Sequence, residues 1–187
     1  MADFFDDDNG LMEKAAGGRS QAFDALVGRR QHRLQRFANR MLGGDSGDAA
    51  DVVAAAFVRL WEIRATFRQT GSVESWLLAT VYRLCLDCLR NRSRCLTENL
   101  PQDEKGSPDA STVAGVVEAV ALGEAVRQAI MELPESHRAV LILSVYEELS
   151  YEEIAAALEI PPGTVASRRS HAVAMLRRKL AAWEEGR

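Results

Sequence analysis

The sequence predicts an all-α protein with two small helical domains joined by a flexible linker. Apolar residues recur at helical spacing over long stretches, no stretch alternates as a half-buried strand would, and a polar segment between the helical blocks contains Pro101, Gly106 and Pro108. The 187 residues suit one or two small domains, and 47% hydrophobic residues are enough for real cores. The predicted parts are an acidic N-terminal segment (1–19), a helical domain (20–95), the linker (96–117) and a C-terminal helical domain (118–187).

Three amphipathic patterns predict the helices of the first domain. The first covers residues 20–41 and ends at Gly43-Gly44. The second follows Ser46, which we expect to cap it, and the third covers residues 73–92. Each pattern gathers its apolar residues on one face, as expected of helices that cover a common core.

The C-terminal domain contains two short helical patterns separated by a break at residues 160–163. Ser150 and Glu153 have the spacing of a capping box at the start of the first helix, and Pro161 and Pro162 cannot continue that helix. We expect Thr164 to cap the second helix. Together these signals predict a helix-turn-helix, which places its second helix in the DNA major groove. An ordinary helical hairpin with a solvated basic end is the alternative.

Polar and basic side chains on the second helix are the candidates for DNA contact. Arg168 is the best single candidate, because a guanidinium can bond guanine through two hydrogen bonds. Arg177 and Arg178 are expected to meet phosphate. The full candidate set is Thr164, Val165, Ser167, Arg168, Arg169, Ser170, His171, Arg177 and Arg178.

Charge is unevenly distributed along the chain, whose formal net charge is −4. Local patches decide where phosphate can bind, while the overall acidity argues against strong non-specific DNA binding. The N-terminus lacks the features of a signal peptide and no apolar run is long enough to span a bilayer, so we expect a cytoplasmic protein. Two arginine-rich stretches precede the basic final helix: Arg29, Arg30, Arg33, Arg36 and Arg40, and then Arg83, Arg90, Arg92 and Arg94.

The spacing Cys85-x-x-Cys88 raises the question of a metal or redox site. No second pair follows, since Cys95 stands alone, and the histidines lack zinc-ligand spacing. Both cysteines lie within a helical pattern, which favours a buried apolar role; a thiol sensor or metal site is the alternative. The sequence offers no nucleophile–base pair and no phosphate-binding glycine loop, so we predict no catalytic residues, metal or cofactor.

Three motifs resemble, in order, parts of bacterial RNA polymerase sigma factors. Asp48-Ala49-x-Asp51-Val52-Val53-x-x-x-Phe57-Val58-Arg59-Leu60-Trp61 resembles their core-binding helix. Val73-x-Ser75-Trp76-Leu77, continued by Leu86-Asp87-x-Leu89-Arg90, resembles their −10-reading helix. Gly163-Thr164-Val165-x-Ser167-Arg168 resembles their −35-reading helix. Two domains and a short linker are similar to the extracytoplasmic-function (ECF) group.

This resemblance implies a protein that binds core polymerase (β and β′ subunits) and promoter DNA, under the control of an anti-sigma factor. A core role is the alternative for Trp76. The implied polymerase contacts are Asp48, Asp51, Val52, Phe57, Arg59 and Glu62. The implied contacts with melted −10 DNA are Arg68, Gln69, Trp76, Tyr82, Arg83, Arg90 and Arg92.

The chain departs from the family pattern at several positions. Ala54 and Ala55 stand where a Gln-Glu pair is common, which predicts weaker polar contacts with polymerase. Arg83 replaces a common asparagine and Ala166 a common lysine, so the promoter sequence is not predicted. Two other classes stay open: a helix-turn-helix regulator that dimerises on a palindrome, which would not require the pattern at residues 48–61, and an enzyme.

Overall fold

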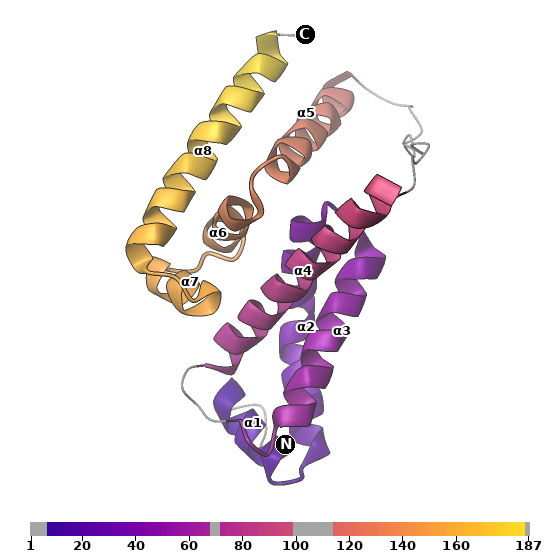
Figure 1. Cartoon of the computed structure of the whole chain (residues 1–187), viewed down its shortest axis with the longest axis vertical. Coiled ribbons are helices and arrows are strands. Elements are labelled where there is room, and N and C mark those ends of the chain that lie inside the picture. The colour runs from indigo at the N-terminus through magenta and orange to yellow at the C-terminus, as the bar shows by residue number, and fades with distance from the viewer. Residues whose placement is uncertain (1–6, 68–71, 99–113, 186–187) are drawn as a thin grey trace.

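The computed structural model describes residues 7–67, 72–98 and 114–185, which form eight α-helices and no strand (Figure 1). The all-α prediction is therefore confirmed. None of the helices in these ranges is both long enough and apolar enough to cross a membrane.

The first four helices form an N-terminal bundle in which α2 contacts each of the others. Its centre consists of large side chains that are almost fully buried, among them Leu26, Phe37, Met41, Leu60 and Leu77. The bundle comprises α1 (Asp8–Ala16), α2 (Ser20–Leu42), α3 (Ser46–Ile63) and α4 (Val73–Glu98).

Helix α1 was not predicted, because its stretch was assigned to an acidic N-terminal segment. Its Leu11, Met12 and Ala15 are buried at helical spacing, and the Asp7 side chain caps its first turn by accepting from the Gly10 N–H. The acidic residues therefore begin a helix that belongs to the core.

The turn between α2 and α3 contains the residue that ends one helix and the residue that caps the next. Gly43 terminates α2 with φ of 83°, a left-handed conformation that glycine adopts without strain. Asp45, and not Ser46 as predicted, caps α3, because its carboxylate accepts from the N–H groups of Gly47 and Asp48.

The C-terminal domain comprises α5 (Ala114–Met131), α6 (Glu135–Val145), α7 (Tyr151–Leu158) and α8 (Pro162–Glu185). Ile130, Leu133, Leu141 and Ala172 form a core that belongs to this domain alone. Helices α4 and α5 extend further into the predicted linker than expected, and residues 99–113 lie outside the described residues.

The two domains pack against each other. Helix α6 contacts α2 and α7 contacts α4, so that α2 and α4 together face the C-terminal helices (Figure 1). Arg138 of α6 is 5% exposed and joins the domains by donating to the carbonyl of Met41 at 2.8 Å. Within its own domain it donates to the carbonyls of Ile130, Met131 and Leu133.

Candidate nucleic-acid interface

Helices α7 and α8 form the predicted helix-turn-helix. The capping box is present: the Glu153 N–H donates to Ser150 Oγ at 3.2 Å and the Ser150 N–H donates to Glu153 Oε2 at 2.8 Å. These hydrogen bonds lower the pKa of Glu153. Helix α7 ends at Glu159, which adopts a left-handed conformation with φ of 56°.

The second helix begins earlier than predicted. Pro162 is its first residue, a position where proline costs nothing because the N–H there has no helical partner. Thr164 therefore lies in the first turn and does not cap α8, and its N–H donates to the Pro161 carbonyl.

Most of the DNA candidates on α8 face solvent. Val165 is the exception: it is fully buried in the apolar core that both domains share, so it does not contact DNA in this arrangement. Arg168 and Arg169 are partly exposed. Within the described part of the chain, Arg168, Arg169, Arg177 and Arg178 form no ion pair. The exposed candidates are Ser167, Ser170, His171, Arg177 and Arg178.

The basic stretch on α2 is used in a different way from that expected. Arg29 and Arg30 pair with Asp8 of α1, which is only 7% exposed. Arg30 and Arg33 also pair with Glu74 of α4. These arginines hold helices together, so they are less available to phosphate than a basic stretch in the sequence suggests. Ion pairs with Glu147 of the C-terminal domain are formed by Arg33, Arg36 and Arg40.

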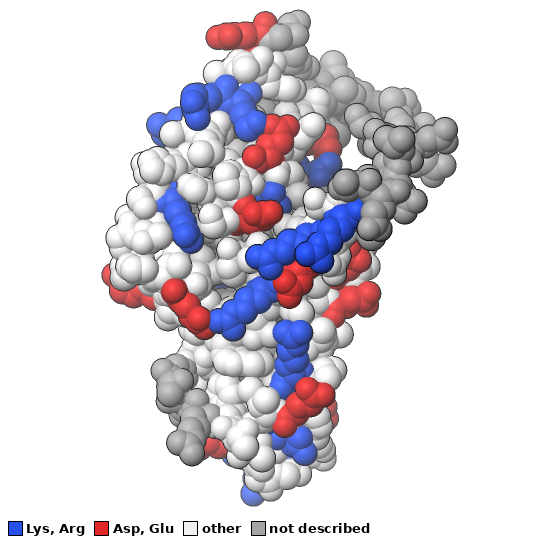
Figure 2. Space-filling view, viewed as in Figure 1, with Lys and Arg blue, Asp and Glu red and all other residues white. Residues whose placement is uncertain are grey.

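Helix α4 carries a diagonal band of basic side chains on one face of the molecule, interrupted by acids (Figure 2). Arg90 is exposed and pairs with Asp87 one turn away. Arg83 is exposed and its Nη2 lies 2.5 Å from Oε1 of Glu159. Arg92 is bound inside its own domain, to Asp45, Asp48 and the Leu42 carbonyl. Arg92 is therefore less available to DNA than its sequence position suggested.

The aromatic candidates of α4 are partly buried. Trp76 packs edge-on against Phe67, with ring centroids 6.0 Å apart, and borders the main core, as the alternative interpretation expected. Tyr82 is half-buried, and burial raises its pKa. Arg68 and Gln69 lie outside the described residues.

Helix α3 presents an exposed strip with an apolar centre. Ala54 is exposed, and Val58 has 56% of its surface exposed although it is a large apolar residue. Asp51, Arg59 and Glu62 border them, and all three are exposed. Val58 was absent from the predicted contact set; the signal for it was an apolar residue away from the apolar face of its helix.

Three of the predicted polymerase contacts do not belong to this exposed strip of α3. Val52 and Phe57 are only 8% and 7% exposed, because they pack into the bundle core, and cannot meet a partner from there. Asp48 holds α3 to α4: it pairs with Arg92, and the Cys88 thiol donates to its Oδ2 at 3.1 Å. The Cys88 thiol and then Arg92 lower the pKa of this carboxyl.

Comparison with known proteins assigns the chain to a protein family. The models for sigma-70 region 2 and sigma-70 region 4 match residues 26–95 and 123–176. The ECF RNA polymerase sigma-E factor of Escherichia coli is 31% identical over 173 residues, which are 86% of this chain and 87% of the relative. The chain belongs to the ECF group of the sigma-70 family. ECF sigma factors are transcription initiation factors that bind core RNA polymerase and promoter DNA.

Other relatives agree with this assignment. The ECF sigma factor SigE of Mycolicibacterium smegmatis is 35% identical over 148 residues, 79% of this chain, and the match spans 57% of SigE. The structure of CnrH in complex with the cytosolic domain of CnrY superposes with a TM-score of 0.70 and 25% identity, over 95% of this chain and 99% of CnrH. The sigma factor RpoE of Bartonella quintana, solved with the anti-sigma factor NepR, shares the fold, with a TM-score of 0.65 and 21% identity over 85% of this chain and 96% of RpoE.

Cys85 and Cys88 have the environment of structural residues. Cys85 is fully buried, and burial raises its pKa to about 12. Burial, and then the neighbouring Asp48 carboxylate, also raise the pKa of the Cys88 thiol. Raised pKa values disfavour the reactive thiolate. In the described ranges no group of three His, Cys, Asp or Glu side chains could hold a metal ion.

Proposed function

We propose that this sigma factor binds core polymerase through the exposed strip of α3, reads −35 duplex DNA with α8, and contacts melted −10 DNA with α4. The observation that carries this proposal is the contrast between arginines. Those of α8 form no ion pair in the described ranges, whereas those of α2 pair with acids of other helices. Unpaired guanidinium groups on a helix-turn-helix are available to bases and phosphates.

The proposed polymerase contact is centred on Val58. An apolar centre with a charged rim is typical of protein interfaces, and Asp51, Arg59 and Glu62 supply the rim. Ala54 and Ala55 widen the apolar centre at the positions where the family resemblance led us to expect a Gln-Glu pair. We therefore propose that this interface with polymerase is less polar than it would be with a Gln-Glu pair at these positions.

The proposed −10 contact uses the outer face of α4. Arg90 and Arg83 are exposed and can follow a single-stranded backbone, and Tyr82 can stack on an unpaired base once it is uncovered. Arg92 is left out because its guanidinium is engaged by Asp45 and Asp48.

We further propose that an anti-sigma factor controls the protein, which would act in the cytoplasm, and that the chemistry of RNA synthesis belongs entirely to polymerase. Support for an inhibitor comes from CnrH, which is similar over almost the whole chain and was solved with a bound partner, the cytosolic domain of CnrY.

The substitution Val58→Glu tests the polymerase contact. A charge at the centre of an interface should weaken binding to core polymerase by at least tenfold, because apolar interface centres carry much of the binding energy, ~2 kcal/mol per central residue. The chain should remain folded, since Val58 is exposed. Val120→Glu on α5 is the matched control, because that valine is 58% exposed. Equal binding by Val58→Glu and the control would rule out the α3 strip.

A further inference from the structure

Helix α1 has no part in the contacts proposed above, yet it packs on both α2 and α4. It lies outside the stretch matched by the sigma-70 region 2 model, which begins at residue 26. Leu11 and Met12 of α1 belong to the main core, and the Asn9 side chain reaches the start of α4. Because α4 carries the proposed contacts with melted −10 DNA, the way in which α1 holds it bears on promoter recognition.

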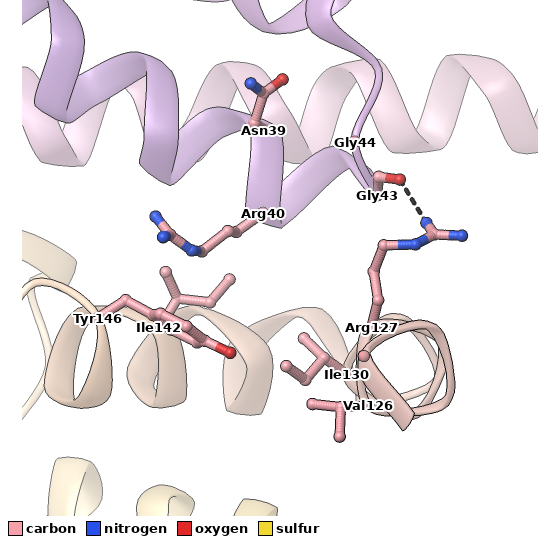
Figure 3. A pocket seen from close by; sticks show the side chains of 10 residues that line it. Asn39, Arg40, Gly43, Gly44, Val126, Arg127, Ile130, Ile142 and Tyr146 are labelled. Atoms are coloured by element: carbon pink, nitrogen blue, oxygen red, sulfur yellow. Dashed lines mark hydrogen bonds between the residues drawn. The ribbon is translucent and has the colours of Figure 1, made fainter. Parts of the chain in front are cut away.

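Side chains from distant elements satisfy free backbone groups at two helix ends. At the end of α2, Arg127 of α5 donates to the Gly43 carbonyl at 2.6 Å, at the edge of a cavity of about 260 Å³ between α2, α5 and α6 (Figure 3). At the start of α4, the Val73 N–H donates to Oδ1 of Asn9 at 3.0 Å. The two ends differ in their access to water, because Val73 is fully buried whereas Gly43 borders the cavity.

Asn9 acts as a helix cap although it lies 64 positions before Val73. The first N–H groups of a helix have no partner within that helix, and a side-chain oxygen commonly accepts from one of them. Ser72, which directly precedes α4, accepts instead from the Ser75 N–H at 3.0 Å. Removal of the Asn9 oxygen would therefore leave the buried Val73 N–H without an acceptor, which costs more than the loss of an exposed hydrogen bond.

A charged bridge supports the same contact. Asp8, the neighbour of Asn9, is 7% exposed and pairs with Arg30 of α2. Arg30 Nη1 also lies 2.9 Å from Oε1 of Glu74, the second residue of α4. Arg30 therefore links the first turn of α1 to the first turn of α4.

The position of this first turn matters for the rest of α4. A helix rises about 1.5 Å per residue, so Tyr82 and Arg83 lie roughly 15 Å beyond Val73 on the same rigid element. If the start of α4 frayed or tilted, these two side chains would be displaced, and they carry the proposed −10 contact.

We propose that Asn9 is a positioning residue for −10 recognition: its side-chain oxygen holds the first turn of α4 in place, with Asp8, Arg30 and Glu74 in support. This inference rests on the proposed function, in which α4 contacts melted DNA. Binding to core polymerase and to −35 DNA uses other helices, so neither should depend on the Asn9 oxygen.

Two variants of Asn9 test the proposal: Asn9→Ala removes the acceptor, and Asn9→Asp keeps an oxygen at the same position. Promoter melting by the holoenzyme is measured as permanganate reactivity of thymines in the −10 element, at a promoter identified from mapped start sites. We expect Asn9→Ala to lower the melted fraction about fivefold, the factor that corresponds to loss of a typical helix cap. The Kd values for core polymerase and for a −35 duplex should not change, and Asn9→Asp should restore melting.

Leu11→Val is the matched control, because it trims a fully buried side chain of the same helix and leaves the Asn9 oxygen in place. It should lower the free energy of unfolding at least as much as Asn9→Ala does, without a comparable loss of melting. Hydrogen exchange in the free chain supplies a measurement that needs no polymerase: the Val73 amide should exchange faster in Asn9→Ala than in Leu11→Val.

The positioning role is overturned if Asn9→Ala melts promoters normally, if Leu11→Val or Asn9→Asp is equally defective, or if exchange of the Val73 amide is unchanged in Asn9→Ala. A chain that carries both Tyr82→Ala and Arg83→Ala separates this outcome from failure of the proposed function. Normal melting by that chain would contradict the −10 contact of α4, while exchange of the Val73 amide still decides whether Asn9 holds the first turn.

Discussion

Helices α2 and α8 are both rich in arginine, yet the structure uses the two sets in different ways. On α2 the arginines face acids from other elements: Asp8 on α1, Glu74 on α4 and Glu147 after α6. On α8 no acid in the described ranges pairs with Arg168, Arg169, Arg177 or Arg178. A basic run in a sequence therefore does not by itself indicate a DNA surface, because acids from other elements of the fold can bind its side chains.

The largest effect is expected at Arg138 of α6, which like the arginines of α2 holds helices together and is more buried than they are. Arg138→Met should lower the free energy of unfolding by about 3–5 kcal/mol, because four carbonyls lose a charged donor. Urea denaturation measures the loss. A loss below about 1 kcal/mol would show that water replaces the guanidinium and that Arg138 does not join the domains.

Arg168→Ala tests the arginines of α8, which form no ion pair in the described ranges. We expect promoter DNA affinity to fall by about 1–3 kcal/mol, the usual value of a good bidentate base contact, with no change in unfolding free energy. Fluorescence anisotropy with a duplex carrying the −35 site, identified from mapped start sites, measures the affinity. Unchanged affinity together with lower stability would mean that Arg168 stabilises the fold, as the arginines of α2 do, and does not contact DNA.

Arg33 and Arg36 form a matched pair on α2 that differs mainly in burial. Arg33→Ala should cost about 1–2 kcal/mol of stability, because Glu147 and Glu74 both lose a partner. Arg36→Ala should cost less than about 0.5 kcal/mol, since its side chain is 57% exposed and 3.9 Å from Glu147. Equal losses in thermal or urea unfolding would contradict the role given to burial.

A small effect that depends on pH is expected at Asp48. Its folded-state pKa is lowered, so its contribution to stability is present above the unfolded pKa of about 3.9 and disappears as pH falls through the folded value. Asp48→Asn should therefore cost ~0.5 kcal/mol at neutral pH, as a partly exposed pair does, and progressively less as pH falls through the folded-state pKa. A cost that persists in acid would mean that the carboxylate charge is not what stabilises α3 against α4.

Local signals predicted much of this fold. The capping box at Ser150 and Glu153, the helix end at Gly43 and the break before α8 depend on neighbouring residues, and each was readable in the sequence. Thr164 was misassigned as a cap because Pro162 already fits the first helical position. Helix α1 was missed because its nine residues were assigned to an acidic segment.

The candidate sites were harder to predict because they depend on partners distant in sequence. Glu147 lies more than 100 positions from Arg33, so nothing near either residue indicates their contact. Arg92 and Asp48 were assigned to separate surfaces, and only the packing of α3 on α4 shows that they bind each other. Pairing of this kind is a property of tertiary structure.

The most direct test of the contrast between α2 and α8 is run-off transcription with purified core polymerase and three forms of the chain. The unsubstituted protein should initiate at specific promoters, Arg168→Ala should lose most of that promoter-specific product, and Arg33→Ala should retain it. Full activity of Arg168→Ala together with loss of activity in folded Arg33→Ala would contradict the account, since it would assign DNA recognition to the arginines of α2.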